Sequence, residues 1–283
     1  MKVLVTGAGG QLGSEVVHVF AARGYEVVGT THESLDITDA VAVEAALQRE
    51  QPDWVIHCAA WTAVDACESD AEKAFLVNAS ATEVIVQAAS RVGARVVYIS
   101  TDYVFDGSKN GPYVESDIVN PQSVYGASKL AGERAMHEED LVVRVSWLCG
   151  FTGSNMVKTI LRIAEANPEL SFVSDQVGHP TFADDAARKI IELVDGNHCG
   201  IFHVTNQGAV SWYEFAQEVL RAADLDPLRV KPVTTAGLLP ARPAKRPANS
   251  VLANAALTSA GVELLDDFRV PLRRLVKRLS IPL

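Results

Sequence analysis

The first residues of the chain constrain its fold more than any other stretch. An apolar run, Val3 to Thr6, leads into Gly7, Gly10 and Gly13, and a helical pattern follows. A continuous apolar run is typical of a strand that is covered on both faces of a parallel sheet. Glycines between a strand and a helix allow a tight turn and let the backbone approach a pyrophosphate at the helix N-terminus. A glycine turn without a ligand is the alternative, but the flanking strand and helix favour a dinucleotide site.

The order of strand and then helix recurs along the first hundred residues. Strands are predicted at 3–6, 26–30, 52–57 and 95–99, and helices at 14–23 and 40–50. Asp65, Glu68 and Asp70 lead into a further long predicted helix that runs through Ala89. Such alternation predicts a parallel sheet with right-handed crossovers. A fifth strand is predicted at 141–147, a helix at 182–194 and a further strand at 201–204.

These elements predict an α/β fold with a Rossmann-like doubly wound parallel sheet and a smaller C-terminal substrate-binding domain. Residues 1–149 are expected to form the NAD(P)-binding domain, to which 182–206 return. Residues 150–283 are expected to form mainly the substrate-binding domain, since the strand-helix pattern loosens after Gly150.

Composition excludes several classes of function. The chain has 35 acidic and 25 basic residues, a formal charge of -10, which argues against binding a nucleic acid polymer. No apolar run is long enough for a transmembrane helix, and the N-terminus leads straight into structure, so we expect a cytoplasmic protein without membrane contact. The cysteines (Cys58, Cys67, Cys149, Cys199) form no zinc-binding pattern and are expected to be buried free thiols.

The end of the second strand bears on the choice of cofactor. NAD-specific sites carry an acidic residue there, which grips the ribose 2′-hydroxyl. Here the sequence is Thr30-Thr31-His32, which favours NADPH, with NADH as the alternative because Glu33 is close. Asp36 is either a helix cap or a residue facing the adenine. Ala59 and Ala60 follow the third strand, and their small size suits a cofactor lying against the backbone.

The chemistry is predicted where the fourth strand ends. Ser100 and Thr101 close that strand, and Tyr125 and Lys129 lie four residues apart on a predicted helix, so they share one face. A phenol with a pKa near ~10 is poorly matched to proton transfer at neutral pH, and a neighbouring ammonium would lower that pKa. Thr101, or Ser100, could hold a substrate oxygen, and Lys129 could also bind the cofactor ribose. A Tyr and a Lys at this spacing also occur by chance, but the nucleotide motif favours a catalytic site.

The chain resembles the extended short-chain dehydrogenases/reductases through Gly7-x-x-Gly10-x-x-Gly13, Thr101 and Tyr125-x-x-x-Lys129. More narrowly, it resembles the dTDP-4-dehydrorhamnose reductase family. The motifs that carry this resemblance are Ala59-Ala60-Trp61-Thr62-Ala63-Val64-Asp65, Ser100-Thr101-Asp102-Tyr103-Val104-Phe105-Asp106-Gly107, Asp175-Gln176-x-Gly178-x-Pro180-Thr181 and Arg246-Pro247-Ala248-Asn249-Ser250.

The resemblance implies reduction of a dTDP-4-keto-6-deoxy sugar to dTDP-L-rhamnose by hydride transfer from NADPH, for cell-surface polysaccharide. Tyr125 would give the proton, Lys129 would tune Tyr125 and hold the ribose, and Thr101 would bind the carbonyl oxygen. Further residues match cofactor-contact positions of the family: Gln11, Leu12, Asp36, Ile37, Ala60 and Thr62. Asp102 matches a substrate-contact position, and Tyr103 beside it is assigned to the same site.

Residues of the C-terminal half complete the predicted substrate site. Trp147 either stacks on the sugar or fills the core, and the resemblance favours the sugar. Gln176 lies in a loop-like segment and either reaches a ligand or caps a turn. Arg246 belongs to a basic cluster and could bind a diphosphate bidentately. Trp212 begins an apolar stripe with Phe215, Val219 and Leu220, which we assign to the core.

The sequence also bears on metal binding and on the oligomeric state. Some bacterial members of the family form magnesium-linked dimers through glutamates, and Glu15 is suitably placed. The C-terminal tail from Lys277 carries no acidic residue, which argues against Mg²⁺, and we expect a monomer or a homodimer. Two alternatives remain: a sugar-nucleotide epimerase or dehydratase with tightly held NAD, and a non-catalytic NADP-binding regulatory subunit.

Overall fold

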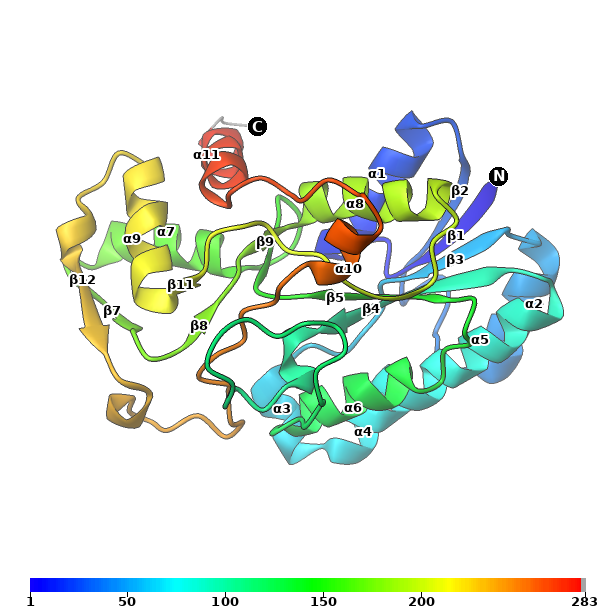
Figure 1. The fold of residues 1–283 in the computed structure, drawn as a ribbon, viewed down its shortest axis with the longest axis horizontal. Helices are drawn as coiled ribbons and strands as arrows, with labels where there is room; N and C mark the ends of the chain where they lie inside the picture. The colour runs from blue at the N-terminus through cyan, green and yellow to red at the C-terminus, as the bar shows by residue number, and fades with distance from the viewer. Residues whose placement is uncertain (281–283) are drawn as a thin grey trace.

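The computed structural model describes residues 1–280, in which a six-stranded parallel sheet organises the larger lobe (Figure 1). The strands lie in the order β10 (Gly200–His203), β5 (Leu141–Val145), β4 (Arg95–Thr101), β3 (Trp54–His57), β1 (Lys2–Thr6) and β2 (Glu26–Thr30). Because β1 pairs with both β2 and β3, the chain changes direction across the sheet at β1, beside the glycine turn. The predicted fold class is confirmed.

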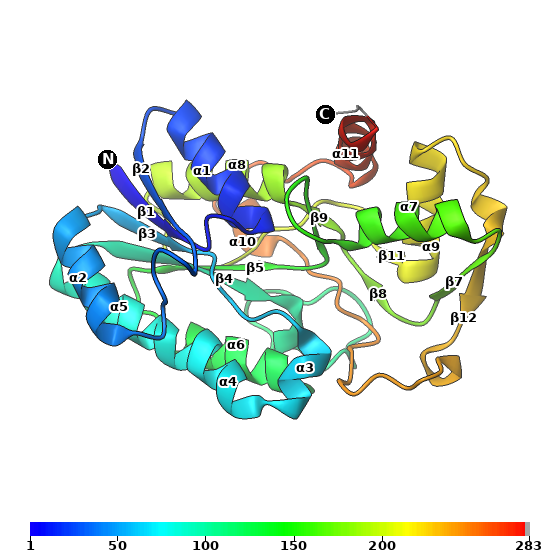
Figure 2. The ribbon, with the colours of Figure 1, turned by 180° about the vertical axis from the view of Figure 1, so that it is seen from behind.

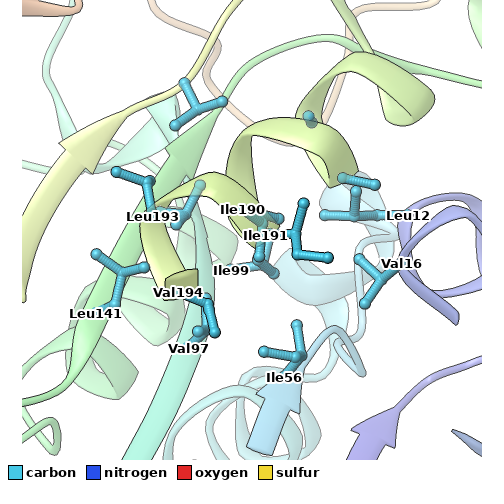
Figure 3. Packing of buried hydrophobic residues seen from close by; sticks show 14 of the residues in the cluster. Leu12, Val16, Ile56, Val97, Ile99, Leu141, Ile190, Ile191, Leu193 and Val194 are labelled. Carbon is cyan, nitrogen blue, oxygen red and sulfur yellow. The ribbon is translucent and has the colours of Figure 1, made fainter. Parts of the chain in front are cut away.

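Helices cover both faces of this sheet (Figures 1 and 2). On one face lie α1 (Gln11–Ala22) and α8 (Ala183–Asp195); on the other lie α2 (Ala40–Glu50), α5 (Ala81–Arg91) and α6 (Val124–Glu133). Figure 3 shows the first interface, where Val16 of α1 and Ile190 of α8 meet Ile56, Val97 and Ile99 of the strands. Both faces are therefore apolar, as the unbroken apolar strands predict.

A smaller lobe, at the left of Figure 1, has its own core. Its helices are α7 (Met156–Ala166), α9 (Trp212–Ala222) and α11 (Arg269–Leu279), and its two-stranded ladders are β7 (Leu170–Val173) with β12 (Val230–Val233), β8 (Val177–Gly178) with β11 (Val210–Ser211), and β6 (Leu148–Cys149) with β9 (Thr181–Phe182). Phe215, Val219 and Leu220 are fully buried here, as predicted for the apolar stripe of α9.

The helix and strand predicted after residue 182 are α8 and β10, and β10 pairs with β5 of the large sheet. Within residues 1–280, no helix is long and apolar enough to span a membrane.

The long helix predicted after Asp70 and through Ala89 is present, but it is not a single α-helix. The chain forms α3 (Val64–Ser69), α4 (Ala71–Phe75), a π-helical turn (Leu76–Ser80) and then α5. Asp70 leaves the helical conformation and its carboxylate accepts from Lys73 N at 3.0 Å, which starts α4 anew. In the π turn, the Asn78 side chain bonds the Trp61 backbone and the Ser128 hydroxyl, and the Asn78 backbone carbonyl accepts from the Tyr98 hydroxyl of β4.

Two further expectations need correction. The strand predicted over 141–147 ends at Val145, because Trp147 has a φ of 45°, which no strand residue adopts. All four cysteines are free, but only Cys67 and Cys149 are buried: Cys58 is partly exposed, and Cys199 is exposed because it precedes the edge strand β10.

A buried ion pair fixes α6 on the sheet. Arg144 of β5 donates to both carboxylate oxygens of Glu133 at 2.8 and 2.7 Å, and Ser100 of β4 donates to the same carboxylate. Arg144 is 2 % exposed and Glu133 is 8 % exposed. Loss of one partner would leave an uncompensated buried charge, which costs about 3–5 kcal/mol.

Close packing of α6 also depends on Gly132. A Cβ atom there would lie 2.3 Å from the Tyr98 hydroxyl and 2.5 Å from the Asn78 carbonyl oxygen. The helix that carries Tyr125 and Lys129 can therefore approach β4 only with a glycine at this position.

We expect Gly132→Ala to lower the free energy of unfolding by about 1–3 kcal/mol, because overpacking outweighs the gain in helix propensity. Urea unfolding measures this change. Gly9→Ala is the matched control, since the nearest atom to its Cβ, Thr31 Cγ2, is 3.5 Å away. Equal stability of Gly132→Ala and the wild type would contradict the packing account.

Candidate active site

A cavity of about 390 Å³ lies at the carboxyl edge of the sheet, between the two lobes. Its wall contains the glycine turn, the loop after β3, the end of β4, one face of α6 and the segment after β5. The predicted site residues on this wall are Gly7, Gly10, Gln11, Leu12, Gly13, Ala60, Thr62, Thr101, Asp102, Tyr103, Tyr125, Lys129 and Trp147. Residues from five separate parts of the sequence therefore meet here.

Thr101 lies at the end of β4, where its hydroxyl already makes two hydrogen bonds. Its Oγ1 donates to Asp102 Oδ1 at 3.0 Å and accepts from Tyr103 N at 3.2 Å. Asp102 is 2 % exposed, and burial raises its pKa to about 6. Ser100, the alternative to Thr101, donates to Glu133 instead. Thr101 is thus the strand-end hydroxyl that can turn toward a ligand.

Tyr125 keeps its proton in this structure. Burial raises the pKa of the phenol well above its ordinary value, while a hydrogen bond with the Thr101 hydroxyl acts in the opposite direction. The net lowering of this pKa that we predicted is not found, because loss of solvation outweighs the effect of any charge that faces the phenol. A neutral phenol is the form that can donate a proton.

Lys129 lies one helical turn from Tyr125 and is 2 % exposed. Burial lowers the pKa of its ammonium to about 7, and the Glu133 carboxylate limits that fall. Its Nζ stands 4.0 Å from the centroid of the Tyr98 ring. Lys129 can therefore change its charge near neutral pH, which an exposed lysine cannot do.

The N-terminus of α1 fits a dinucleotide pyrophosphate. Its N-cap, Gly10, offers no capping side chain, and the first turn carries no acidic residue, so the first backbone N–H groups are open to an anion. A Cβ at Gly13 would lie 2.2 Å from the Gly7 carbonyl oxygen. The Gln11 side-chain oxygen is buried without a hydrogen-bond partner among residues 1–280.

A second pocket shares Gly7, Gly10, Cys58 and Ala60 with the cavity and extends from it toward β2. Its other lining residues are Thr31, His32, Leu35, Ile37, Ala59, Trp61, Lys73 and Val77, and none of them is acidic. This is where an adenosine end would lie if the pyrophosphate binds at α1. Ala59 and Ile37 of the predicted cofactor set line it.

Thr30 and Asp36 line neither pocket. Thr30 is buried, and its hydroxyl donates to Val5 O at 3.3 Å. The Asp36 carboxylate accepts from the Thr38 backbone N–H and hydroxyl, which lowers its pKa. The Asp36 side chain therefore caps a turn and not a helix, because the N-cap of α2 is Asp39.

The predicted substrate residues separate into two groups. Asp102, Tyr103 and Trp147 line the cavity. Gln176 does not; its amide donates to the Thr235 hydroxyl at 2.9 Å and ties β8 to the segment after β12. Arg246 also lies off the cavity wall.

Arg246 is paired with a carboxylate of the opposite lobe. It donates to both oxygens of Asp65, at 3.0 and 2.8 Å, and Arg242 lies 3.4 Å from the same carboxylate. The Arg246 bond holds the pKa of Asp65 at about 2. A diphosphate would have to compete with Asp65 for this guanidinium.

Sequence reasoning missed Trp212 as a site residue. It was assigned to the core because of its helical spacing with Phe215, yet it lines the cavity at the first position of α9. Its ring stacks on Trp147 with a centroid distance of 3.6 Å and an interplanar angle of 9°. The signal for this role is the contact between Trp147 and Trp212, which lie 65 positions apart in the sequence, so no local pattern contains it. Ser146, Leu148, Cys58 and Val64 also line the cavity and were not predicted.

Trp147 carries backbone strain at this wall. Its left-handed φ of 45° costs on the order of 1–3 kcal/mol in a non-glycine residue. Such strain persists where neighbouring residues fix the backbone conformation, and it is found most often at active sites and ligand-binding sites.

Glu15, the residue named for a metal-linked dimer, lies 3.8 Å from the Arg278 guanidinium. Within residues 1–280 there is no group of three or more His, Cys, Asp or Glu residues that could hold a metal ion. A cation at Glu15 would therefore face the Arg278 guanidinium. Residues 281–283 of the tail lie outside the described part.

Comparison with known proteins agrees with this site. The family described as "RmlD substrate binding domain" matches residues 1–281. The chain is 42 % identical over 264 residues to the spore coat polysaccharide biosynthesis protein SpsK of Bacillus subtilis, covering 92 % of each chain.

Two solved structures are also similar. A dTDP-4-dehydrorhamnose reductase of Clostridium acetobutylicum superposes with a TM-score of 0.95 at 42 % identity, over 99 % of this chain and 100 % of that one. The enzyme of Bacillus anthracis, in complex with NADP, gives a TM-score of 0.94 at 36 % identity, over 98 % and 99 %.

Fold and site define an NAD(P)H-dependent oxidoreductase of the extended short-chain dehydrogenase/reductase type. Within that class, the chain belongs to the RmlD substrate binding domain family, which includes dTDP-4-dehydrorhamnose reductases.

The burial of Lys129 makes a prediction about stability. Its pKa is lower in the folded chain than in the unfolded chain, so the unfolded chain binds more protons between about pH 7 and the ordinary lysine pKa. The free energy of unfolding should therefore rise with pH in that window. Lys129→Met removes this dependence. We expect the variant to be more stable than the wild type at pH 7, with the difference shrinking by up to about 1.4 kcal/mol per pH unit toward pH 9.

Urea unfolding at several pH values measures both proteins. Lys277→Met, at an exposed position of α11, is the control and should differ from the wild type by the same amount at every pH. A difference for Lys129→Met that does not change with pH would show that the ammonium is not desolvated as described.

Proposed function

We propose that the protein reduces dTDP-4-dehydro-L-rhamnose to dTDP-L-rhamnose with NADPH. The observation that carries the proposal is one cavity in which a protonated, buried Tyr125 and the Thr101 hydroxyl stand beside an open helix N-terminus suited to a pyrophosphate. The family supports the coarser reaction, reduction of a 4-keto group on a dTDP-linked sugar. The names of the similar structures support rhamnose as the sugar, and that of SpsK supports a role in surface polysaccharide.

NADPH, when bound, supplies the hydride that adds to C4 of the sugar. The chain's own residues handle the proton. Tyr125 gives its phenolic proton to the carbonyl oxygen, so that the ketone becomes a hydroxyl group and Tyr125 is left as a phenolate. Thr101 turns its hydroxyl proton from Asp102 to the carbonyl oxygen and fixes its position. Lys129 stabilises the phenolate while it is protonated, and its pKa near 7 lets it pass a proton on.

The preference for NADPH rests on the second pocket. A ribose 2′-phosphate carries negative charge, and a carboxylate at the end of β2 would repel it. The pocket there offers Thr31, His32 and Lys73 and no acidic side chain. The NADP found in the Bacillus anthracis structure agrees with this preference.

Purified protein supplied with dTDP-4-dehydro-L-rhamnose should consume NADPH, followed as loss of reduced nicotinamide absorbance, and consume NADH more slowly. Parallel assays with dTDP-4-dehydro-6-deoxy-D-glucose test the choice of sugar. Faster turnover of that second sugar would replace the proposed substrate. No turnover of either sugar with either cofactor would overturn the proposal.

Tyr125→Phe removes the proton donor and leaves the ring in place. We expect turnover to fall by roughly 10²–10⁴-fold, as for loss of a general acid, with NADPH affinity retained. Tyr25→Phe is the matched control, because Tyr25 bonds Asp195 away from the cavity. A Tyr125→Phe enzyme with wild-type turnover would remove Tyr125 from its assigned role.

A further inference from the structure

Trp147 and Trp212 form one aromatic wall of the cavity, although they come from different lobes of the chain. Trp147 follows β5 of the large sheet, and Trp212 is the first residue of α9. Their rings are parallel within 9° at 3.6 Å, and both line the cavity. Phe215 supports the pair from the core, at 6.4 and 5.9 Å from the two rings.

The position of Trp147 is set from three sides. Its backbone is left-handed, an unfavourable conformation for a tryptophan that its surroundings must hold. One ring face lies on Trp212. The edge lies against β8, where a Cβ at Gly178 would be 2.7 Å from Trp147 Cε2. Trp212 is itself fixed, because Ser211 and Glu214 form a capping box at the start of α9.

The register of the sheet decides which part of a ligand this wall meets. Val145 of β5 pairs with Thr101 of β4, and Trp147 comes only two residues later. The wall therefore stands beside the hydroxyl that we assign to the reacting carbonyl, at the sugar end of the cavity rather than the base end. Aromatic rings suit the apolar C–H face of a pyranose, and a 6-deoxy sugar adds a methyl group to that face.

We propose that Trp212 is a specificity-determining residue: it holds Trp147 in place, and the stacked pair packs against the apolar face of the deoxy sugar. This inference rests on the proposed function. Trp212 acts on sugar recognition and not on the base, the diphosphate or proton transfer.

The test compares two ligands that share the base and the diphosphate. In the presence of NADP⁺, titration calorimetry gives the affinities for dTDP-L-rhamnose and for dTDP. We expect Trp212→Ala to weaken dTDP-L-rhamnose about five- to tenfold, the effect of losing one aromatic contact, and to leave dTDP within about twofold. Gly178→Ala, which displaces Trp147 from its other edge, should give the same selective loss. Trp212→Phe should restore most of the affinity.

Circular dichroism tests the stack itself. Two tryptophans at this separation give an exciton couplet in the far ultraviolet, which Trp147→Phe and Trp212→Phe should each remove. Trp54→Phe, the same change at a buried tryptophan outside the cavity, should keep both the couplet and the affinities.

The outcomes are distinguishable. An equal loss for dTDP and dTDP-L-rhamnose, or no loss for either, would overturn this inference while leaving the proposed reaction intact. A wild-type protein that binds neither ligand would overturn the proposed function and this inference with it.

Discussion

The buried pair of Arg144 and Glu133 is the interaction on which the site depends. It joins β5 to α6, and Ser100 adds β4 to the same carboxylate, so three elements from 45 residues of sequence share one network. Tyr125, Lys129 and Glu133 follow one another at intervals of four on α6, so they share a face. Fixing Glu133 against the sheet thereby fixes the phenol and the ammonium relative to Thr101.

Burial sets the electrostatics of this cavity. It raises the pKa of Tyr125, raises that of Asp102 and lowers that of Lys129, so each group is driven toward its neutral form. The Glu133 carboxylate opposes this fall in the Lys129 pKa, and it is itself held by Arg144. A site that keeps its acid protonated and its lysine near its titration point suits proton donation to a ketone.

Local sequence patterns predicted much of the fold and of the candidate active site. The apolar run before Gly7 and the repeated strands and helices gave the parallel sheet, because covered strands and glycine turns have local signatures. They also brought Thr101, Tyr125 and Lys129 to one edge, since parallel strands end together. They failed at Trp212, whose helical spacing matched core residues, and at the π-helical turn, Leu76–Ser80, inside the long helix before β4.

The sequence by itself determined the fold class, the glycine turn and the helical spacing of Tyr125 and Lys129, because each depends on neighbours close along the chain. Only the tertiary structure decided the ionisation of these groups and the partners of the longer-range side chains. Burial keeps the Tyr125 phenol protonated. The tertiary structure also pairs Arg246 with Asp65 and stacks Trp147 on Trp212. Desolvation and stacking depend on residues far apart in sequence, so no local pattern could have predicted them.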